Sequence, residues 1–178
     1  FVLATQNPIE MEGTYSLPEA QLDRFLFNVL IDYLPEADEV AVVQQTTSRA
    51  PVALAPIFSA EDVLAFQELV RRVPVAEAVV RYAVRLAAAT RPKRAGAPDF
   101  VNNWVNWGAG TRAAQALILG SKARALWQGR AHVTGDDVRA LAAPVLRHRI
   151  LLNYRAEADG VSVEQVIEKL VAAVPKET

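Results

Sequence analysis

The spacing of hydrophobic positions changes near residue 50 of the 178-residue chain. Before that point, short apolar runs are separated by polar loops. They predict strands over residues 1–5 and 25–31, a short helix over 17–24 between them, and a helix over 36–45. Pro8 ends the first run and Pro35 opens the last one. The order strand, short helix, strand, helix is typical of part of an α/β unit.

After that point the apolar residues recur at helical spacing. Residues 46–56, rich in Thr, Ser, Ala and Pro, indicate a linker. Ser59 followed by Asp62 predicts an N-cap and a capping box for the next helix. Further helices are expected over residues 75–90, 111–128, 134–146 and 162–173, a short strand over 150–152, and a long irregular stretch over 91–110.

These patterns predict a mainly α chain in three parts. Residues 1–48 are expected to be a fragment of an α/β core, residues 49–58 a linker and residues 59–178 an all-helical domain. Because the apolar run at residues 1–5 has no preceding segment with which to pair, we expect the chain to be a fragment of a longer protein.

Composition narrows the possible functions. The net charge is −1, with 19 basic and 20 acidic residues, so no overall field favours nucleic acid or anionic membrane. There is no cysteine and only two histidines, which leaves no disulfide framework or thiolate zinc site. No apolar run reaches the roughly 18 to 20 residues of a membrane span, and no signal peptide is recognisable. We expect a cytoplasmic protein.

Asn7 lies just beyond the carboxyl end of the first predicted strand. An amide there offers both a donor and an acceptor from a stiff base, and could orient a water molecule or a phosphate oxygen. An isolated Asn before a proline is more often simply a turn residue.

Arg24 is the second candidate, in the sequence Leu-Asp-Arg-Phe of residues 22–25. Apolar neighbours would anchor the short helix and leave the guanidinium projecting. A projecting arginine can stabilise a transferring phosphoryl group, an effect of about 10³ to 10⁵ in rate. The alternative is a local ion pair with Asp23 or Glu19.

Arg112 is the third candidate. It follows Gly108 and Gly110 at the start of the longest predicted helix, where free backbone N–H groups and the helix dipole favour an anion. Helix starts after glycine are common, so the feature is weak by itself.

Eight short segments around and beyond these candidates form a recognisable pattern: ATQNPIE (residues 4–10), EGTY (12–15), LPEAQLDRF (17–25), WGAGTRA (107–113), GR (129–130), VT (133–134), DDV (136–138) and VLRHR (145–149). Taken together, these segments resemble the MoxR family of AAA+ ATPases along nearly the whole chain. Ser16 and Thr111 depart from the family pattern, because proline is usual at both positions.

The resemblance implies a role for each candidate. Asn7 matches the family's sensor 1, Arg24 its arginine finger and Arg112 its sensor 2. The finger would act on the nucleotide of a neighbouring subunit, whereas the sequence leaves open whether Arg112 acts on its own subunit or a neighbour. Residues 1–48 would then belong to the AAA+ α/β core and residues 59–178 to the helical lid.

The chain contains no Gly-x-x-x-x-Gly-Lys-Ser/Thr loop and no acidic pair at a strand end for magnesium. We therefore expect ATP and Mg²⁺ to be cofactors of the full-length protein and not of this segment, which we expect to be inactive alone.

The resemblance also implies a homo-oligomeric ring, expected to be a hexamer, that remodels or matures client proteins, with von Willebrand factor A-domain proteins as partners. Two alternatives remain. One is a related AAA+ motor of the magnesium-chelatase or helicase type. The other is a non-enzymatic helical module that binds proteins through the loop of Trp104 and Trp107 or the basic residues 147–149. The tryptophans would equally suit a packed loop anchor, and the basic cluster would equally complement a helix dipole.

Overall fold

The computed structural model describes residues 2–6, 17–48 and 54–176. Helices dominate these ranges, so the prediction of a mainly α chain is confirmed. The helices are α1 (Glu19–Leu22), α2 (Glu36–Ser48), α3 (Ala60–Arg72), α4 (Glu77–Ala89), α5 (Asp99–Trp104), α6 (Thr111–Trp127), α7 (Gly135–Ala140), α8 (Ala142–Leu146), α9 (Tyr154–Ala158) and α10 (Val163–Ala173).

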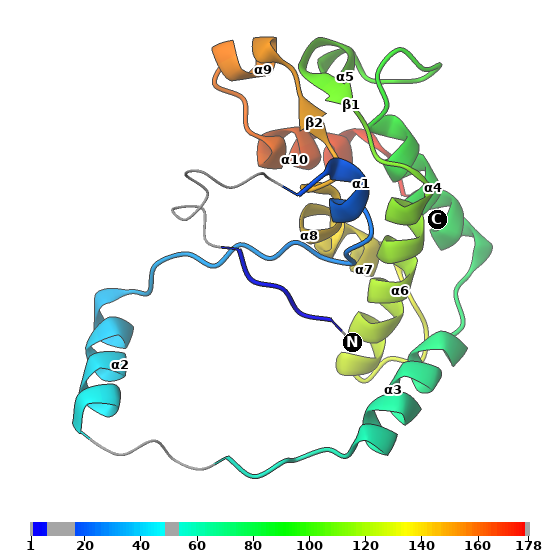
Figure 1. Ribbon diagram of the computed structural model, residues 1–178. Helices are drawn as coiled ribbons and strands as arrows, with labels where there is room; N and C mark the ends of the chain where they lie inside the picture. Colours follow the sequence, from blue (N-terminus) through cyan, green and yellow to red (C-terminus); the bar gives the residue numbers. More distant parts are fainter. Residues whose placement is uncertain (1, 7–16, 49–53, 177–178) are drawn as a thin grey trace.

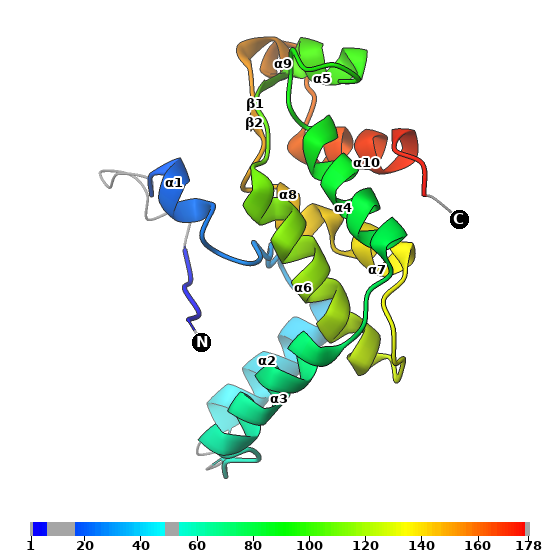
Figure 2. The same cartoon turned by 90° about the vertical axis from the view of Figure 1, so that its right-hand side faces the viewer.

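The helices α4, α5, α6, α7, α8 and α10 pack around one apolar core, and α9 lies against α5. The long helix α6 lies against α4 on one side and against α7 and α8 on the other, and α10 closes the group against α8 and α4 (Figures 1 and 2). The largest fully buried side chains come from several of these helices and include Tyr82, Leu86, Leu117, Leu146 and Leu170.

The expected helix starts are formed as the sequence indicates. The Ser59 hydroxyl accepts from the Asp62 N–H at 3.1 Å, and the Asp62 carboxylate accepts from the Ser59 N–H at 2.9 Å. Ser162 and Gln165 make the same reciprocal pair at α10. Gly129 follows the end of α6 with φ +69°, a conformation that suits glycine.

The helix predicted over residues 134–146 is two helices, α7 and α8, that meet at Leu141 with φ −100° and ψ 0°.

The start of α7 depends on Asp137, which is fully buried. The carboxylate accepts from the Thr134 N–H at 2.9 Å, from Arg130 at 2.5 Å and from Arg124 at 2.7 Å. Burial raises the pKa of Asp137, but these hydrogen bonds outweigh burial and hold the pKa well below its ordinary value.

The helical domain also contains one short two-stranded sheet. β1 (Val105–Trp107) pairs antiparallel with β2 (Leu151–Leu152), with Val105 opposite Leu152 and Trp107 opposite Leu151. The predicted strand at residues 150–152 is thereby confirmed. The irregular stretch predicted over 91–110 contains α5 and β1 instead, since Pro98 and Asp99 open a helix that the sequence pattern did not predict.

The strands predicted before residue 48 are not formed in the part that the structure describes. Residues 2–5 and 25–31 have no ladder partner there. A strand needs a neighbour to satisfy its backbone groups, and residues 25–28 satisfy some of theirs differently. The Asn28 N–H donates to the Pro144 carbonyl at 2.8 Å, so this segment lies as a strap along the end of α8.

The two helices of this region are confirmed. α1 is short and bears no buried residue, and α2 begins directly after Pro35. α2 stands apart from the helices that surround the core, and an extended segment connects it to α1 (Figure 1).

Candidate functional site

Two of the three predicted site residues lie at one place. Arg24, which follows α1, and Arg112, in the first turn of α6, both line a hollow of about 200 Å³. Asp23 and Arg149 line it as well. Asn7 lies outside the residues that the structure describes.

Asp23 is the anionic centre of this hollow. Its carboxylate pairs with Arg112 at 3.1 Å and with Arg149 at 3.0 Å. The local pair between Asp23 and Arg24 that the sequence left open is therefore not the arrangement seen. Within the described ranges the exposed Arg24 guanidinium has no ion pair, which leaves it able to receive an anion.

The start of α6 is held against the end of α4 by close backbone contact. The buried Thr90 hydroxyl accepts from the Ala109 N–H at 2.8 Å, and Arg91 Nε donates to the Ala109 carbonyl at 2.8 Å. A Cβ on Gly108 would lie 2.3 Å from the Thr90 carbonyl oxygen, so only glycine allows this approach. These contacts fix the helix turn that carries Arg112.

Arg149 is the residue that the sequence pattern did not single out. Its side chain is 3% exposed and pairs with Asp23, and its guanidinium also bonds backbone carbonyls of residues 23–26. Burial and the charge of Arg112 lower the pKa of Arg149, and the hydrogen bond and charge of Asp23 oppose this. Arginine stays charged in either case. In the sequence Arg149 belongs to the VLRHR segment (residues 145–149) of the family resemblance and to a cluster of three basic residues at a helix end, where positive charge also suits the helix dipole.

The neighbours of Arg149 hold the same strap. Arg147 donates to the Asn28 carbonyl at 2.7 Å, and His148 Nε2 lies 3.2 Å from the Phe25 carbonyl. Nε2 must carry the proton to donate there, while the buried Nδ1 has no hydrogen-bond partner among the described residues. Burial and then the charge of Arg149 lower the pKa of His148.

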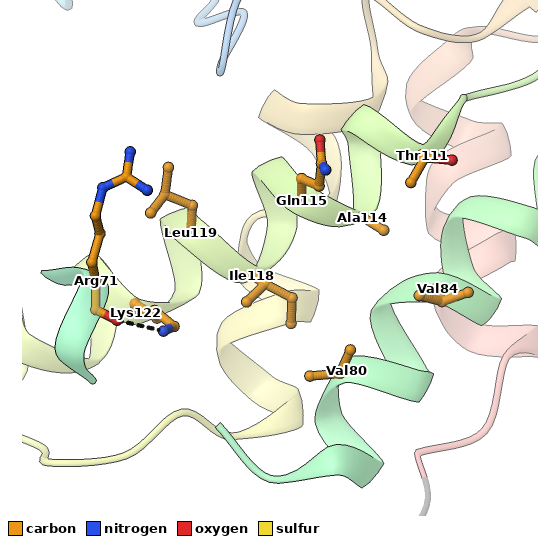
Figure 3. Close-up of a pocket in the computed structure, with 9 residues that line it drawn as sticks. All are labelled: Arg71, Val80, Val84, Thr111, Ala114, Gln115, Ile118, Leu119 and Lys122. Carbon is orange, nitrogen blue, oxygen red and sulfur yellow. Dashed lines mark hydrogen bonds between the residues drawn. The ribbon is translucent and has the colours of Figure 1, made fainter. Parts of the chain in front are cut away.

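A larger hollow of about 520 Å³ lies between α3, α4 and α6, where Figure 3 shows Val80 and Val84 of α4 on one side and Ile118 of α6 on the other. The cationic residues that line this hollow, Arg71 and Lys122, lie at one end of it, where Lys122 donates to the Arg71 carbonyl at 2.9 Å. Because no carboxylate lines this larger hollow, the smaller one is the better candidate for chemistry.

The two loop tryptophans behave differently. Trp104 donates from Nε1 to Asp159 at 2.9 Å and lies beside Phe100, as a loop anchor does. Trp107 is exposed. In the described ranges no group of three His, Asp or Glu residues could hold a metal ion, and no helix is long and apolar enough to cross a membrane.

Comparisons with known proteins show which families the chain resembles and over which residues. Residues 101–170 match the AAA lid domain family, and residues 1–27 match the "ATPase family associated with various cellular activities (AAA)". The first range covers α6 with Arg112 and the basic cluster that includes Arg149. The second covers α1 and the strap as far as Phe27, and therefore includes Arg24.

Named relatives extend the match over the chain. "Chaperone MoxR1" of Mycobacterium tuberculosis is 42% identical over 174 residues, which is 97% of this chain and 46% of that protein. "Protein MoxR" of Paracoccus denitrificans is 30% identical over 189 residues, covering 98% of this chain and 55% of that protein.

A solved structure shows the same fold. A crystal structure from Cytophaga hutchinsonii, named "a putative ATPase", matches 97% of this chain and 53% of that chain with a TM-score of 0.88 and 36% identity. The chain thus spans about half the length of the relatives that it matches. The chain belongs to the MoxR family of AAA+ ATPases and corresponds to their C-terminal region.

Proposed function

We propose that this chain is the hydrolysis-triggering part of a MoxR-type ATPase that couples ATP turnover to the remodelling or maturation of client proteins. In this proposal residues 1–48 belong to the ATPase core, residues 49–58 are the linker and residues 59–178 form the lid. Asn7 acts as sensor 1, Arg24 as the arginine finger and Arg112 as sensor 2. The full-length protein uses ATP and Mg²⁺ and forms a homo-oligomeric ring, expected to be a hexamer.

One observation carries the proposal. Arg24 is exposed at the hollow, while Asp23, its immediate neighbour, pairs with Arg112 and Arg149. A guanidinium with no ion pair among the described residues, next to a neutralised carboxylate, is suited to an incoming phosphate. Arg112 lines the same hollow, so both arginines can approach one phosphate group.

The test is Arg24→Ala in the full-length protein. We expect ATP turnover to fall by about 10³-fold or more, because a finger arginine supplies charge only in the transition state. Nucleotide affinity, measured by fluorescent-nucleotide titration, should stay within about twofold. The control is Arg81→Ala, which removes another exposed arginine that pairs with Glu77 on its own helix. Normal turnover in Arg24→Ala would refute the assignment.

A mixing experiment tests action across the subunit boundary. Arg24→Ala subunits are mixed with subunits whose phosphate-binding lysine has been replaced, each inactive alone. Rings that combine the two should regain turnover, because one subunit binds ATP and its neighbour supplies the finger. Failure to regain turnover in verified mixed rings would place Arg24 in its own subunit's site. Von Willebrand factor A-domain proteins are the proposed partners, to be tested by their effect on this turnover.

A further inference from the structure

We infer that Arg149 is the positioning residue of Arg24: its guanidinium holds the backbone on both sides of Arg24 and so sets the direction in which the Arg24 side chain projects. The inference deepens the function proposed above and rests on it for its kinetic consequence. Its structural part concerns only contacts within the chain.

The guanidinium of Arg149 has five N–H donors, and each has an acceptor. Nε donates to the Asp23 carboxylate at 3.0 Å. One terminal nitrogen donates to the carbonyls of Asp23 and Phe25 at 2.9 and 2.6 Å. The other donates to the carbonyl of Val145 at 2.5 Å and, at a longer 3.4 Å, to that of Leu26. Four of the five bonds therefore reach the segment that contains Arg24.

The segment needs such support because α1 cannot supply it. α1 has four residues and no buried side chain, and a helix of that length is not stable by itself. The carbonyls of Gln21 and Leu22 accept from the N–H groups of Arg24 and Phe25, whereas Asp23 and Phe25 themselves lie beyond the last residue of the helix. Arg149 satisfies the carbonyls of Asp23 and Phe25 from the far side, while the Arg24 N–H donates to the Gln21 carbonyl at 3.1 Å. Hydrogen bonds thereby hold the backbone of Arg24 at its own N–H and at the carbonyls of the residues before and after it.

Arg149 does not itself bind a ligand in this arrangement. Its side chain is 3% exposed, and all of its donors are in use. A lysine at this position would have three donors on a point charge and could not reproduce the planar fork. Arg149→Lys should therefore keep the positive charge but lose some of the hydrogen bonds that hold residues 23–26.

The absence of cysteine from the chain allows a direct test. A single nitroxide is attached at Arg24→Cys in the 178-residue chain, and its mobility is measured by electron paramagnetic resonance. We expect Arg149→Lys to increase that mobility clearly. The matched control is Arg139→Lys, because Arg139 lies in the same domain and donates to the Val171 carbonyl at 2.8 Å. It should leave the label at position 24 unchanged.

A second label at Glu168→Cys, an exposed position on α10, reports on the domain as a whole. If Arg149→Lys leaves position 168 unchanged and also position 24, the inference is wrong. If position 168 loosens as well, the measurement is repeated in trimethylamine N-oxide, which favours the compact state. If the label at position 24 is then as immobile as it is in the parent chain, the inference is also overturned.

Kinetics of the full-length protein separate this inference from the proposed function. Because a small misplacement of a catalytic group can cost about 10²-fold, Arg149→Lys should lower kcat by about 10- to 100-fold with nucleotide affinity unchanged. Arg139→Lys should keep kcat within about twofold. If Arg24→Ala abolishes turnover and Arg149→Lys does not lower it, the positioning role fails alone. If Arg24→Ala is harmless, the proposed function fails, whatever the label shows.

Discussion

The described residues between 17 and 58 contain no buried apolar side chain, whereas those between 77 and 174 contain the apolar core. In the second region Leu117 is 0% exposed and belongs to a continuous core, whereas in the first Ile31 is 91% exposed and Leu54 is 92% exposed. The first region is attached to the second through polar contacts, from Arg147, His148 and Arg149 to backbone carbonyls, and the Phe27 ring lies close to Gly120 of α6.

The difference shows how a site can be placed without a core of its own. Apolar packing is non-directional, but an arginine fork that bonds carbonyls specifies both distance and direction. The segment of residues 23–28, which contains Arg24 and the strap, is therefore expected to respond to changes of charge and donor geometry, and the region around α6 to changes of volume. The following substitutions test that distinction, beginning with the largest expected effect.

Asp137→Ala should destabilise the packed region most. It removes the start of α7 and leaves Arg124 and Arg130 without their carboxylate, and each arginine is only about a third exposed. Breaking a buried pair in this way costs about 3 to 5 kcal/mol in the free energy of unfolding. Urea denaturation followed by circular dichroism measures it. Asp136→Asn, at the adjacent and exposed position that pairs with Lys176, should change little; equal losses would mean that burial of Asp137 is unimportant.

The substitutions Leu117→Ala and Leu54→Ala make the same chemical change in the two regions and so allow a direct comparison. We expect a loss of about 2 to 5 kcal/mol at Leu117, from transfer and cavity formation. At the exposed Leu54 the change should stay within about 0.5 kcal/mol. Thermal unfolding of the two variants provides the comparison, and a similar loss at Leu54 would show that this residue is covered in solution.

Gly108→Ala against Gly110→Ala tests the backbone contact that places Arg112. The new Cβ at Gly108 would meet the Thr90 carbonyl at 2.3 Å, and overpacking of this kind costs about 1 to 3 kcal/mol. A Cβ added at Gly110 would meet no atom within 4 Å, and the φ of Gly110 is −82°, so alanine should be tolerated there. Denaturant midpoints distinguish the two; a Gly108→Ala variant as stable as Gly110→Ala would contradict the close approach.

The smallest effect is the pH dependence that His148 contributes to the strap. Its pKa is lowered in the folded chain, first by burial and then by the charge of Arg149. Below about pH 6.5 the unfolded chain binds a proton that the folded chain resists, so the unfolding free energy should fall as the pH falls below that value. A proton on Nδ1 would also be buried with no acceptor among the described residues.

His148→Gln keeps a donor for the Phe25 carbonyl and has no proton to gain. Denaturation between about pH 7.5 and about pH 5 should therefore show a shallower loss of stability for His148→Gln than for the parent chain. Identical pH profiles would mean that His148 titrates normally in the folded state.

Much of the helical region followed from local sequence. Ser59 with Asp62 and Ser162 with Gln165 determined helix starts, because a capping box depends on residues three apart and on little else. Gly129 marked the end of α6 for a similarly local reason, since its φ is positive. The motifs around Arg24 and Arg112 indicated the MoxR family from the sequence alone, and the comparisons confirm it.

The remaining features were decided by contacts between distant segments. Residues 25–31 have the composition of a strand, yet the strap is held by α8 and its basic cluster, because the chemistry of a strand is completed only by the neighbour that it finds. Arg149 stood out only as a charge near a helix end until the fold placed residues 23–26 around it, more than 120 positions away in the chain. The sequence by itself determined which residues cap and end the helices and which motifs identify the family. The tertiary structure decided that Arg149 is buried and that Arg24 is exposed, because burial depends on which carbonyls of distant segments surround each side chain.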